Sequence, residues 1–385
     1  MSAGLLLKGF EVELFTGQTD GTVVGVAGAA AASLEGFVTE PDHRNLEYTT
    51  PPDADYGHQL ALLVAPRRAL RAWLAGRGLT LLPGSTLSLG DSRRFERSDP
   101  TNDYHGYIEA SYGTRVVTAS VHINFGLTAM DQLFAACRLI RCEAALLLAL
   151  SASSPFLDGV ATGAHSQRWI QFPLTPPQVP LFLSHQHYID WMLQELAAGS
   201  MQNVRHLWTS VRPNGDERPY GLNRLELRIC DLISDPEQLL AITAFAELRL
   251  MQLLEDPAAH DPLRASCLDP KALAALADSN DRAAAAASLE AELHDWRSGE
   301  VIQARSWIER ELTALAPLAQ ATGLTAVLAP VFDILAQGNQ AMRWLERHRN
   351  GASIAGIVSE AITEMAVKEN ALDARLATVA SRALG

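Results

Sequence analysis

Polar and apolar side chains alternate along four short segments of the chain. In residues 8–15, two glutamates occupy alternate positions and apolar side chains stand between them. Residues 45–49, 116–125 and 224–229 repeat this alternation. Because successive side chains of a strand point to opposite faces, the pattern predicts four strands, each with one apolar and one polar face.

The polar positions of these segments carry charged and titratable groups. They are Glu11, Glu13, Glu47, Thr118, Ser120, His122, Asn124, Arg224, Glu226 and Arg228. Taken singly, the glutamates could lie on a solvated edge strand, the histidine could be a core residue, and the arginines could form an ion-pair ladder. Glutamate is depleted in strands, however, and four segments share one arrangement. A sheet face with carboxylates, an imidazole and guanidinium groups suits divalent cations and phosphates.

The segments between and after these strands show other periodicities. Apolar residues at helical spacing predict helices at 59–76, 129–150 and 181–198. Residues 82–89 are predicted to return to strand, and residues 100–112 to form a loop with a short helix.

The strand that contains His122 is expected to be long and to start at Thr114. The loop-rich connection 151–180 is long enough to be functional.

The chain changes character at Asp235. From Asp235 on, alanine and leucine dominate with helical periodicity. We therefore predict an α+β protein with a catalytic domain over 1–234 and a helical region over 235–385 that packs on it.

Composition and charge narrow the class of protein. The chain is 48% hydrophobic and 19% charged, as soluble globular proteins are, and its net charge of −13 makes a nucleic-acid partner unexpected. No apolar stretch reaches the roughly 18 residues of a membrane span, and no secretion signal is recognised. The four cysteines form no C-x-x-C pair, which favours a reducing cytoplasm.

Several common catalytic motifs do not occur in the sequence. There is no phosphate-binding G-x-x-x-x-G-K-[ST] loop, G-x-G-x-x-G fingerprint, H-E-x-x-H motif or G-x-S-x-G elbow. Glutamates with one histidine, and no cysteine ligands, match magnesium, a hard cation that keeps waters and substrate phosphates in its shell. The site is thus expected to hold Mg²⁺ beside a phosphate.

Six motifs together resemble those of glutamate–cysteine ligases, most closely the cyanobacterial type. They lie at 8–13, 45–50, 121–125, 153–159, 162–169 and 224–228, and the resemblance covers most of residues 5–260. It implies a curved antiparallel sheet of glutamine-synthetase type with flanking helices. It also implies ATP-dependent joining of L-glutamate to L-cysteine through a γ-glutamyl phosphate, the first step of glutathione biosynthesis.

The resemblance also implies roles for individual residues. The implied magnesium ligands are Glu11, Glu13, Glu47, His122 and Glu226, with Glu40, seven residues before Glu47, as a further carboxylate. Arg228 would contact the transferring phosphate and, with Glu226, act in catalysis.

Three further residues have implied roles in substrate binding. Arg168 would bind the α-carboxylate of glutamate, because a guanidinium group can bind a carboxylate through two hydrogen bonds. Asn124 would position a substrate, and Arg212 would contact ATP unless it is a turn residue. Ala164 stands where the family often has an aromatic side chain, which leaves amino-acid recognition open.

Three alternatives remain open at this point. The chain could join glutamate to another amine, use the same carboxylates as a metal-dependent hydrolase, or bind ligands without catalysis. ADP release that needs both glutamate and cysteine would separate the ligase from the hydrolase. The helical region also offers surfaces for a homo-oligomer.

Overall fold

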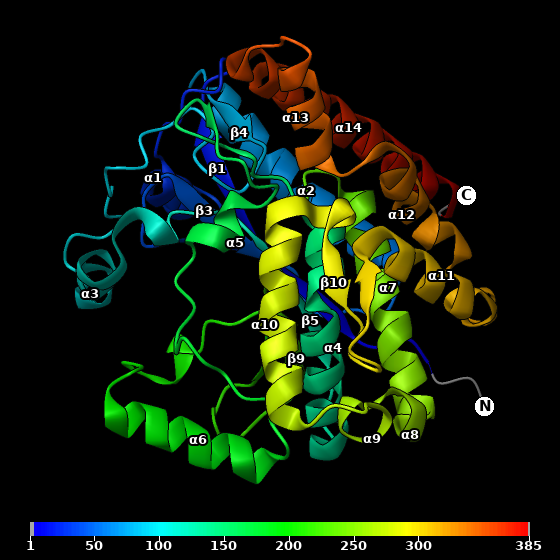
Figure 1. Cartoon of the computed structure of the whole chain (residues 1–385). Coiled ribbons are helices and arrows are strands. Elements are labelled where there is room, and N and C mark those ends of the chain that lie inside the picture. Colours follow the sequence, from blue (N-terminus) through cyan, green and yellow to red (C-terminus); the bar gives the residue numbers. More distant parts are fainter. Residues whose placement is uncertain (1–3, 384–385) are drawn as a thin grey trace.

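A single antiparallel sheet organises the first part of the chain (Figure 1). The computed structural model describes residues 4–383. The sheet has seven strands in the order β2-β3-β1-β5-β9-β8, and β4 also pairs with β1. Its strands are β1 (Lys8–Gly17), β2 (Phe37–Thr39), β3 (Asn45–Thr49), β4 (Thr80–Leu82), β5 (Val121–Gly126), β8 (Val211–Asn214) and β9 (Arg224–Leu227). Every pairing is antiparallel, which confirms the predicted α+β class.

The pairing register places the charged residues opposite one another. Glu13 of β1 pairs with Glu47 of β3, and Glu11 of β1 pairs with His122 of β5. Glu226 of β9 lies between Asn124 of β5 and Arg212 of β8. Since directly opposed residues project to the same face, this register brings the polar positions of five strands together.

Long helices cover the apolar face of the sheet. They are α2 (Tyr56–Ala75), α4 (Met130–Ser151) and α7 (Pro236–Glu255), and α10 (Pro270–Ala287) packs on α4. The Tyr48 hydroxyl, on the face opposite Glu47, donates a hydrogen bond to the Leu63 carbonyl of α2 (3.0 Å). Helix α4 packs against β8 and β9, and α10 lies alongside α4 (Figure 1). The core therefore lies between the sheet and these helices.

Shorter elements complete the molecule. The remaining helices are α1 (Ala27–Ser33), α3 (Asp103–Tyr112), α5 (Gln167–Gln171), α6 (His185–Ala198), α8 (Pro257–His260), α9 (Pro262–Ala265), α11 (Ala304–Ala321), α12 (Thr325–Gln337), α13 (Gln340–Arg349) and α14 (Ile354–Ala383). Two small hairpins, β6 (Phe156–Leu157) with β7 (Val160–Ala161) and β10 (Glu292–His294) with β11 (Val301–Gln303), lie outside the sheet. Within residues 4–383, no helix combines the length and apolar character that a membrane crossing requires.

The structure corrects two of the predicted strands. The strand predicted at 82–89 ends at Leu82, because Pro83 lacks a backbone donor and Gly84 turns the chain with φ +94°. The strand predicted from Thr114 begins only at Val121, after a 3₁₀ turn at Gly113–Val116. The helical region predicted after Asp235 also contains the β10–β11 hairpin.

Candidate functional site

Three glutamates form a carboxylate cluster at one side of the polar sheet face. Glu13 and Glu47 come from adjacent strands and Glu40 follows β2, so that one oxygen of each lies within 4.8 Å of the others. Burial and the nearby charge of Glu13 raise the pKa of Glu40 to about 8. Burial and Glu40 likewise raise the pKa of Glu47 well above its ordinary value. Raised pKa values favour the protonated, neutral form of these carboxyl groups, and a bound cation would shift them to the ionised form.

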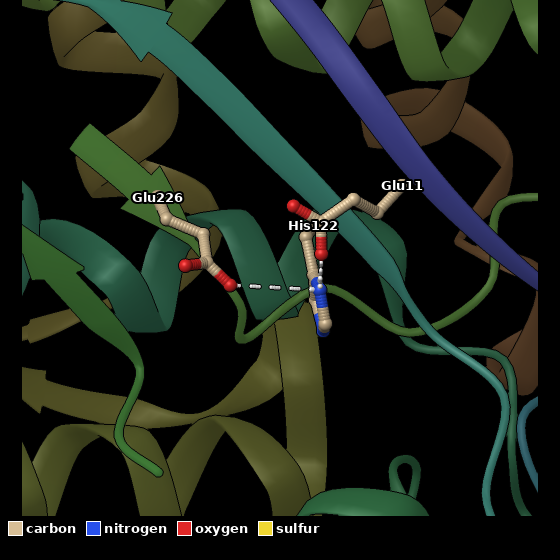
Figure 2. Close-up of side chains that lie close together, drawn as sticks. All are labelled: Glu11, His122 and Glu226. Carbon is tan, nitrogen blue, oxygen red and sulfur yellow. Dashed lines mark hydrogen bonds and ion pairs between the residues drawn. The ribbon is translucent and has the colours of Figure 1, made fainter. Parts of the chain in front are cut away.

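A second cluster combines two carboxylates with an imidazole (Figure 2). His122 Nδ1 lies 2.8 Å from a carboxylate oxygen of Glu11 and 3.7 Å from one of Glu226. The Glu226 side chain is fully buried and the His122 side chain nearly so. The predicted convergence of Glu11, Glu13, Glu47, His122 and Glu226 on one face is therefore confirmed.

Arginines balance the charge of the second cluster. Arg212 donates to both carboxylate oxygens of Glu226, at 2.7 and 3.0 Å, and Arg228 donates to one of them. Asn214 Nδ2 adds a bond of 2.6 Å. Burial alone would raise the pKa of Glu226, but Arg212, Arg228 and His122 hold that pKa well below its ordinary value.

The two clusters therefore fit a divalent cation to different degrees. Glu13, Glu40 and Glu47 supply only oxygen ligands and have no arginine or lysine in ion-pair contact within the described chain, which fits Mg²⁺. In the second cluster, Glu11 and His122 could face a cation. Glu226 instead has both carboxylate oxygens in hydrogen bonds to other side chains, so its role as a ligand stays a prediction.

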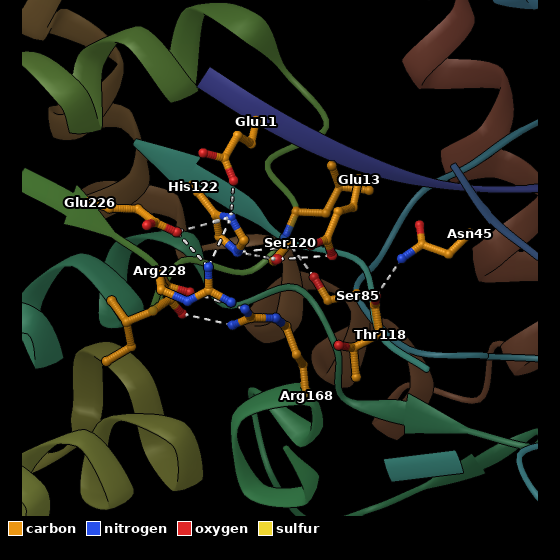
Figure 3. A network of polar contacts seen from close by, with 12 residues as sticks. Glu11, Glu13, Asn45, Ser85, Thr118, Ser120, His122, Arg168, Glu226 and Arg228 are labelled. Atoms are coloured by element: carbon orange, nitrogen blue, oxygen red, sulfur yellow. Dashed lines mark hydrogen bonds and ion pairs between the residues drawn. The ribbon is translucent and has the colours of Figure 1, made fainter. Parts of the chain in front are cut away.

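Ser120 connects the two clusters (Figure 3). Its hydroxyl donates to Glu13 (2.9 Å) and lies 3.2 Å from His122 Nε2. The alternation placed Ser120 on the polar face, but nothing in the sequence indicated that it joins two charged groups.

Arg168 lies beside Arg228, and both line the site (Figure 3). Its Nη1 and Nη2 donate to the carbonyl oxygens of Ile229 (3.1 Å) and Arg228 (3.0 Å). Its Nε is buried without a hydrogen-bond partner in the described structure. Arg168 therefore positions the backbone at Arg228, and binding of the glutamate α-carboxylate stays a prediction for it.

Both clusters open into a cavity of about 500 Å³. Beyond the predicted residues, its lining includes Tyr104, Phe172, Arg205 and Trp208. No sequence pattern points to these four residues. Tyr104 lies in α3, Arg205 in a 3₁₀ turn, and the other two in connecting segments, where no periodicity distinguishes a lining residue from a packed one.

The family model for glutamate–cysteine ligase family 2 matches residues 7–366 of the chain. The chain belongs to this family. Two relatives are named "Putative glutamate–cysteine ligase 2" and "Putative glutamate–cysteine ligase 2-1". The first, from Gloeobacter violaceus, is 27% identical over 84% of this chain and 86% of its own length. The second, from Rubrobacter xylanophilus, is 26% identical over 82% of this chain and 81% of its own length.

Solved structures with this fold include two bacterial enzymes. A glutamate–cysteine ligase from Francisella tularensis, in complex with AMP, superposes with a TM-score of 0.74 at 13% identity and covers 100% of this chain and 95% of its own. A bifunctional glutathione synthetase from Pasteurella multocida gives 0.72 at 16% identity, over 94% of this chain and 52% of its own. These likenesses confirm the antiparallel, glutamine-synthetase-like fold.

Two further predicted residues of this family 2 member can be placed from the structure. Arg212 belongs to β8 and is buried in its pair with Glu226, so its interpretation as a turn residue was wrong. Asn124 lies beside Glu11, to which its Nδ2 donates (3.1 Å), but it lines a neighbouring cavity of about 610 Å³. Glu11 lines both cavities, so a single ligand could extend from one to the other.

Proposed function

We propose that the chain joins the γ-carboxylate of L-glutamate to the amine of L-cysteine in an ATP-dependent reaction. The products would be γ-glutamylcysteine, ADP and phosphate, in the first step of glutathione biosynthesis. One observation carries the proposal: in a member of glutamate–cysteine ligase family 2, an oxygen-ligand cluster and Arg228 line one cavity.

The reaction explains why no side-chain nucleophile is needed. A carboxylate is a poor electrophile, so a γ-carboxylate oxygen of glutamate first attacks the terminal phosphorus of ATP and ADP leaves. The cysteine amine then attacks the acyl carbon of γ-glutamyl phosphate, loses a proton, and phosphate leaves. Phosphoryl transfer depends on positioning and charge stabilisation rather than on covalent chemistry by the protein.

The charged groups of the two clusters, with Arg212 and Arg228, have places in this scheme. Mg²⁺, held by Glu13, Glu40 and Glu47 with Glu11 and His122 near it, would supply positive charge for the ATP phosphates. Arg228 would face the transferring phosphoryl group. Glu226 would orient Arg228 and Arg212, since it bonds to both guanidinium groups.

The neighbouring cavity, which Glu11 and Asn124 line, offers room for a nucleotide that extends away from the clusters. Gly9 is two residues before Glu11 and Gly126 is two residues after Asn124, so both lie on the polar face. A Cβ atom on Gly9 would lie 3.2 Å from the Thr50 carbonyl oxygen, and one on Gly126 would lie 3.3 Å from Leu7 Cβ. The two glycines therefore let neighbouring chain approach the sheet closely at the edge of this cavity. We infer that the base and ribose of ATP lie in this cavity, with the phosphates toward Glu11.

An ADP-release assay tests the proposal. Purified protein is mixed with Mg²⁺ and ATP, and glutamate and cysteine are added singly and together. The proposal expects full ADP release only with both amino acids, and γ-glutamylcysteine as the product identified by mass spectrometry.

Two results would contradict the proposal in different ways. A second amine that replaces cysteine with higher kcat/KM would identify a glutamate ligase for another acceptor. Hydrolysis of a phosphoester or amide without ATP would favour the metal-dependent hydrolase. Removing Mg²⁺ with a chelator should abolish ligation, whichever amine is the acceptor.

A further inference from the structure

A third cavity lies away from the sheet face that carries the clusters. It measures about 550 Å³ and is enclosed by α13, α14 and the start of α7. Figure 1 shows α13 and α14 in orange and red at the edge of the molecule. None of its lining residues lines either of the two cavities on the sheet face. It is therefore a separate candidate binding site.

One wall of this cavity is apolar and firmly held. Trp344 and Met365 are buried and line it. The Trp344 ring stacks on Phe156, with ring centroids 5.9 Å apart and an angle of 7° between the planes. Because this packing fixes the indole on its far side, the surface toward the cavity is preformed for an apolar group.

The cavity also holds an arginine without an acidic partner. Arg343 makes no ion pair with any carboxylate of the described chain, and its Nη1 donates to the Gly338 carbonyl (2.5 Å). Burial lowers the pKa of Arg343, although Glu364 and Asp235 act in the opposite direction from beyond ion-pair distance. Asp235 itself pairs with Lys368 at 3.3 Å. A positive charge thus remains unpaired.

Two further polar atoms near Arg343 are unsatisfied. Gln340 Nε2 and Ser234 Oγ are buried and have no hydrogen-bond partner in the part of the chain that the structure describes. A buried polar atom normally has a partner. An amide donor, a hydroxyl and an unpaired guanidinium that line one small cavity together favour an anion with oxygen acceptors.

We propose that this cavity binds a small organic carboxylate. The carboxylate would accept hydrogen bonds from Arg343 and Gln340, and an apolar body would lie against Trp344 and Met365. The other cations of the lining have partners of their own, because Lys368 pairs with Asp235 and Glu237 and Arg347 pairs with Glu360. Arg343 is therefore the lining cation without an ion pair in the described chain, and it would bind the carboxylate. Glu364 also lines the cavity but is exposed, so the carboxylate would lie on the side of Arg343 away from it.

Titration calorimetry with 4-phenylbutyrate as the probe tests this site on the full chain. The neutral 4-phenylbutanamide and the cationic 4-phenylbutylamine have the same apolar body and serve as ligand controls. We expect 4-phenylbutyrate to bind, and the amide and amine to bind at least about tenfold more weakly, a difference of about 1.4 kcal/mol. Equal binding of the three compounds, or no binding of 4-phenylbutyrate, would overturn the proposal.

Variants locate the binding site. Arg343→Gln should weaken 4-phenylbutyrate binding about tenfold, whereas Arg349→Gln, which removes an exposed arginine from the same helix, should leave it unchanged. Ala371→Trp, at the exposed rim, should block the cavity without altering Arg343. Unchanged binding in both Arg343→Gln and Ala371→Trp would show that the probe binds elsewhere. If Arg343→Gln does not fold, Ala371→Trp still decides.

Discussion

Two glutamates of the same sheet face have opposite electrostatic surroundings. Glu226 lies among Arg212, Arg228 and His122, which hold its pKa well below the ordinary value despite its burial. Glu47 lies against another carboxylate, and burial with that neighbour raises its pKa. The first glutamate is therefore ionised and orients arginines, whereas the second is stabilised as an anion only when a cation is near.

Replacing Arg228 should abolish turnover without unfolding the protein. Arg228→Ala removes the positive charge that is proposed to face the phosphoryl group, and removal of one such stabilising group typically costs about 10²–10³ in kcat. Arg228→Lys keeps the charge and should retain more activity. Glu226→Gln should also be inactive, because it releases both arginines. ADP release is measured, with circular dichroism as the folding control; full activity in Arg228→Ala would rule out the phosphoryl role.

Magnesium should stabilise the protein through the carboxylate cluster. A ligand at a hundred times its Kd raises the free energy of unfolding by about 2.7 kcal/mol, so Mg²⁺ should raise the Tm of the unmodified chain. Glu47→Gln should reduce this rise by removing one ligand of the cluster. Glu35→Gln, an exposed glutamate before β2, is the matched control and should keep the full rise. An identical rise in Glu47→Gln would place the ion elsewhere.

At the scale of elements, a buried polar network joins two helices to the sheet. Arg141 of α4 donates to the hydroxyls of Thr209 (2.8 Å) and Ser210 (2.6 Å) and pairs with Asp278 of α10. The Ser210 carbonyl in turn accepts a hydrogen bond from the Arg228 backbone N–H (2.8 Å). The network thus links α4 and α10 to the strand end that carries the proposed phosphoryl contact.

Asp281 should make the stability of this network depend on pH. Burial raises its pKa from 3.8 to about 7, although Arg141, 3.6 Å away, acts in the opposite direction. The folded state therefore keeps a proton on Asp281 that the unfolded state releases. The contribution of Asp281 to the free energy of unfolding is fully present below about pH 4 and is lost as the pH rises to about 7. Asp281→Asn should flatten this decline, and the exposed Asp333→Asn should not. Urea unfolding across that pH range measures it; the same slope in Asp281→Asn would contradict the prediction.

At the scale of the whole molecule, buried ion pairs cross the boundary predicted after residue 234. Lys8 of β1 pairs with Glu247 of α7 at 3.1 Å, and neither side chain is exposed. Arg249 of α7 pairs with Glu143 of α4 at 2.7 Å, also in the interior. Loss of one member of a buried pair costs about 3–5 kcal/mol, so both parts depend on each other for the burial of their charges.

A chain cut after residue 234 should therefore fail to fold alone. It would expose the apolar side of α4 that α7 and α10 cover, and leave Lys8 and Glu143 unpaired. Calorimetry should show a cooperative transition for the full chain and none for residues 1–234. A cooperative transition in the fragment would show that 1–234 folds as an independent domain.

The sequence alone determined which side chains share a face. The period of two in β1, β3, β5 and β9 is local, so it placed Glu11, Glu13, Glu47, His122 and Glu226 correctly before any pairing was known. Helices 59–76 and 129–150 were predictable for the same reason, since α2 and α4 follow a period of 3.6 residues with ends shifted by a few positions.

Tertiary structure decided which of these residues meet and what state they adopt. The pairing of Arg212 with Glu226 depends on β8 and β9 being neighbours, and the approach of Glu40 to Glu13 depends on where β2 ends. Protonation depends on burial and on charges from distant segments. The same residue type therefore orients arginines at Glu226 and belongs to a candidate cation site at Glu47. Local periodicity carries no information about those long-range neighbours, and only the folded chain brings them together.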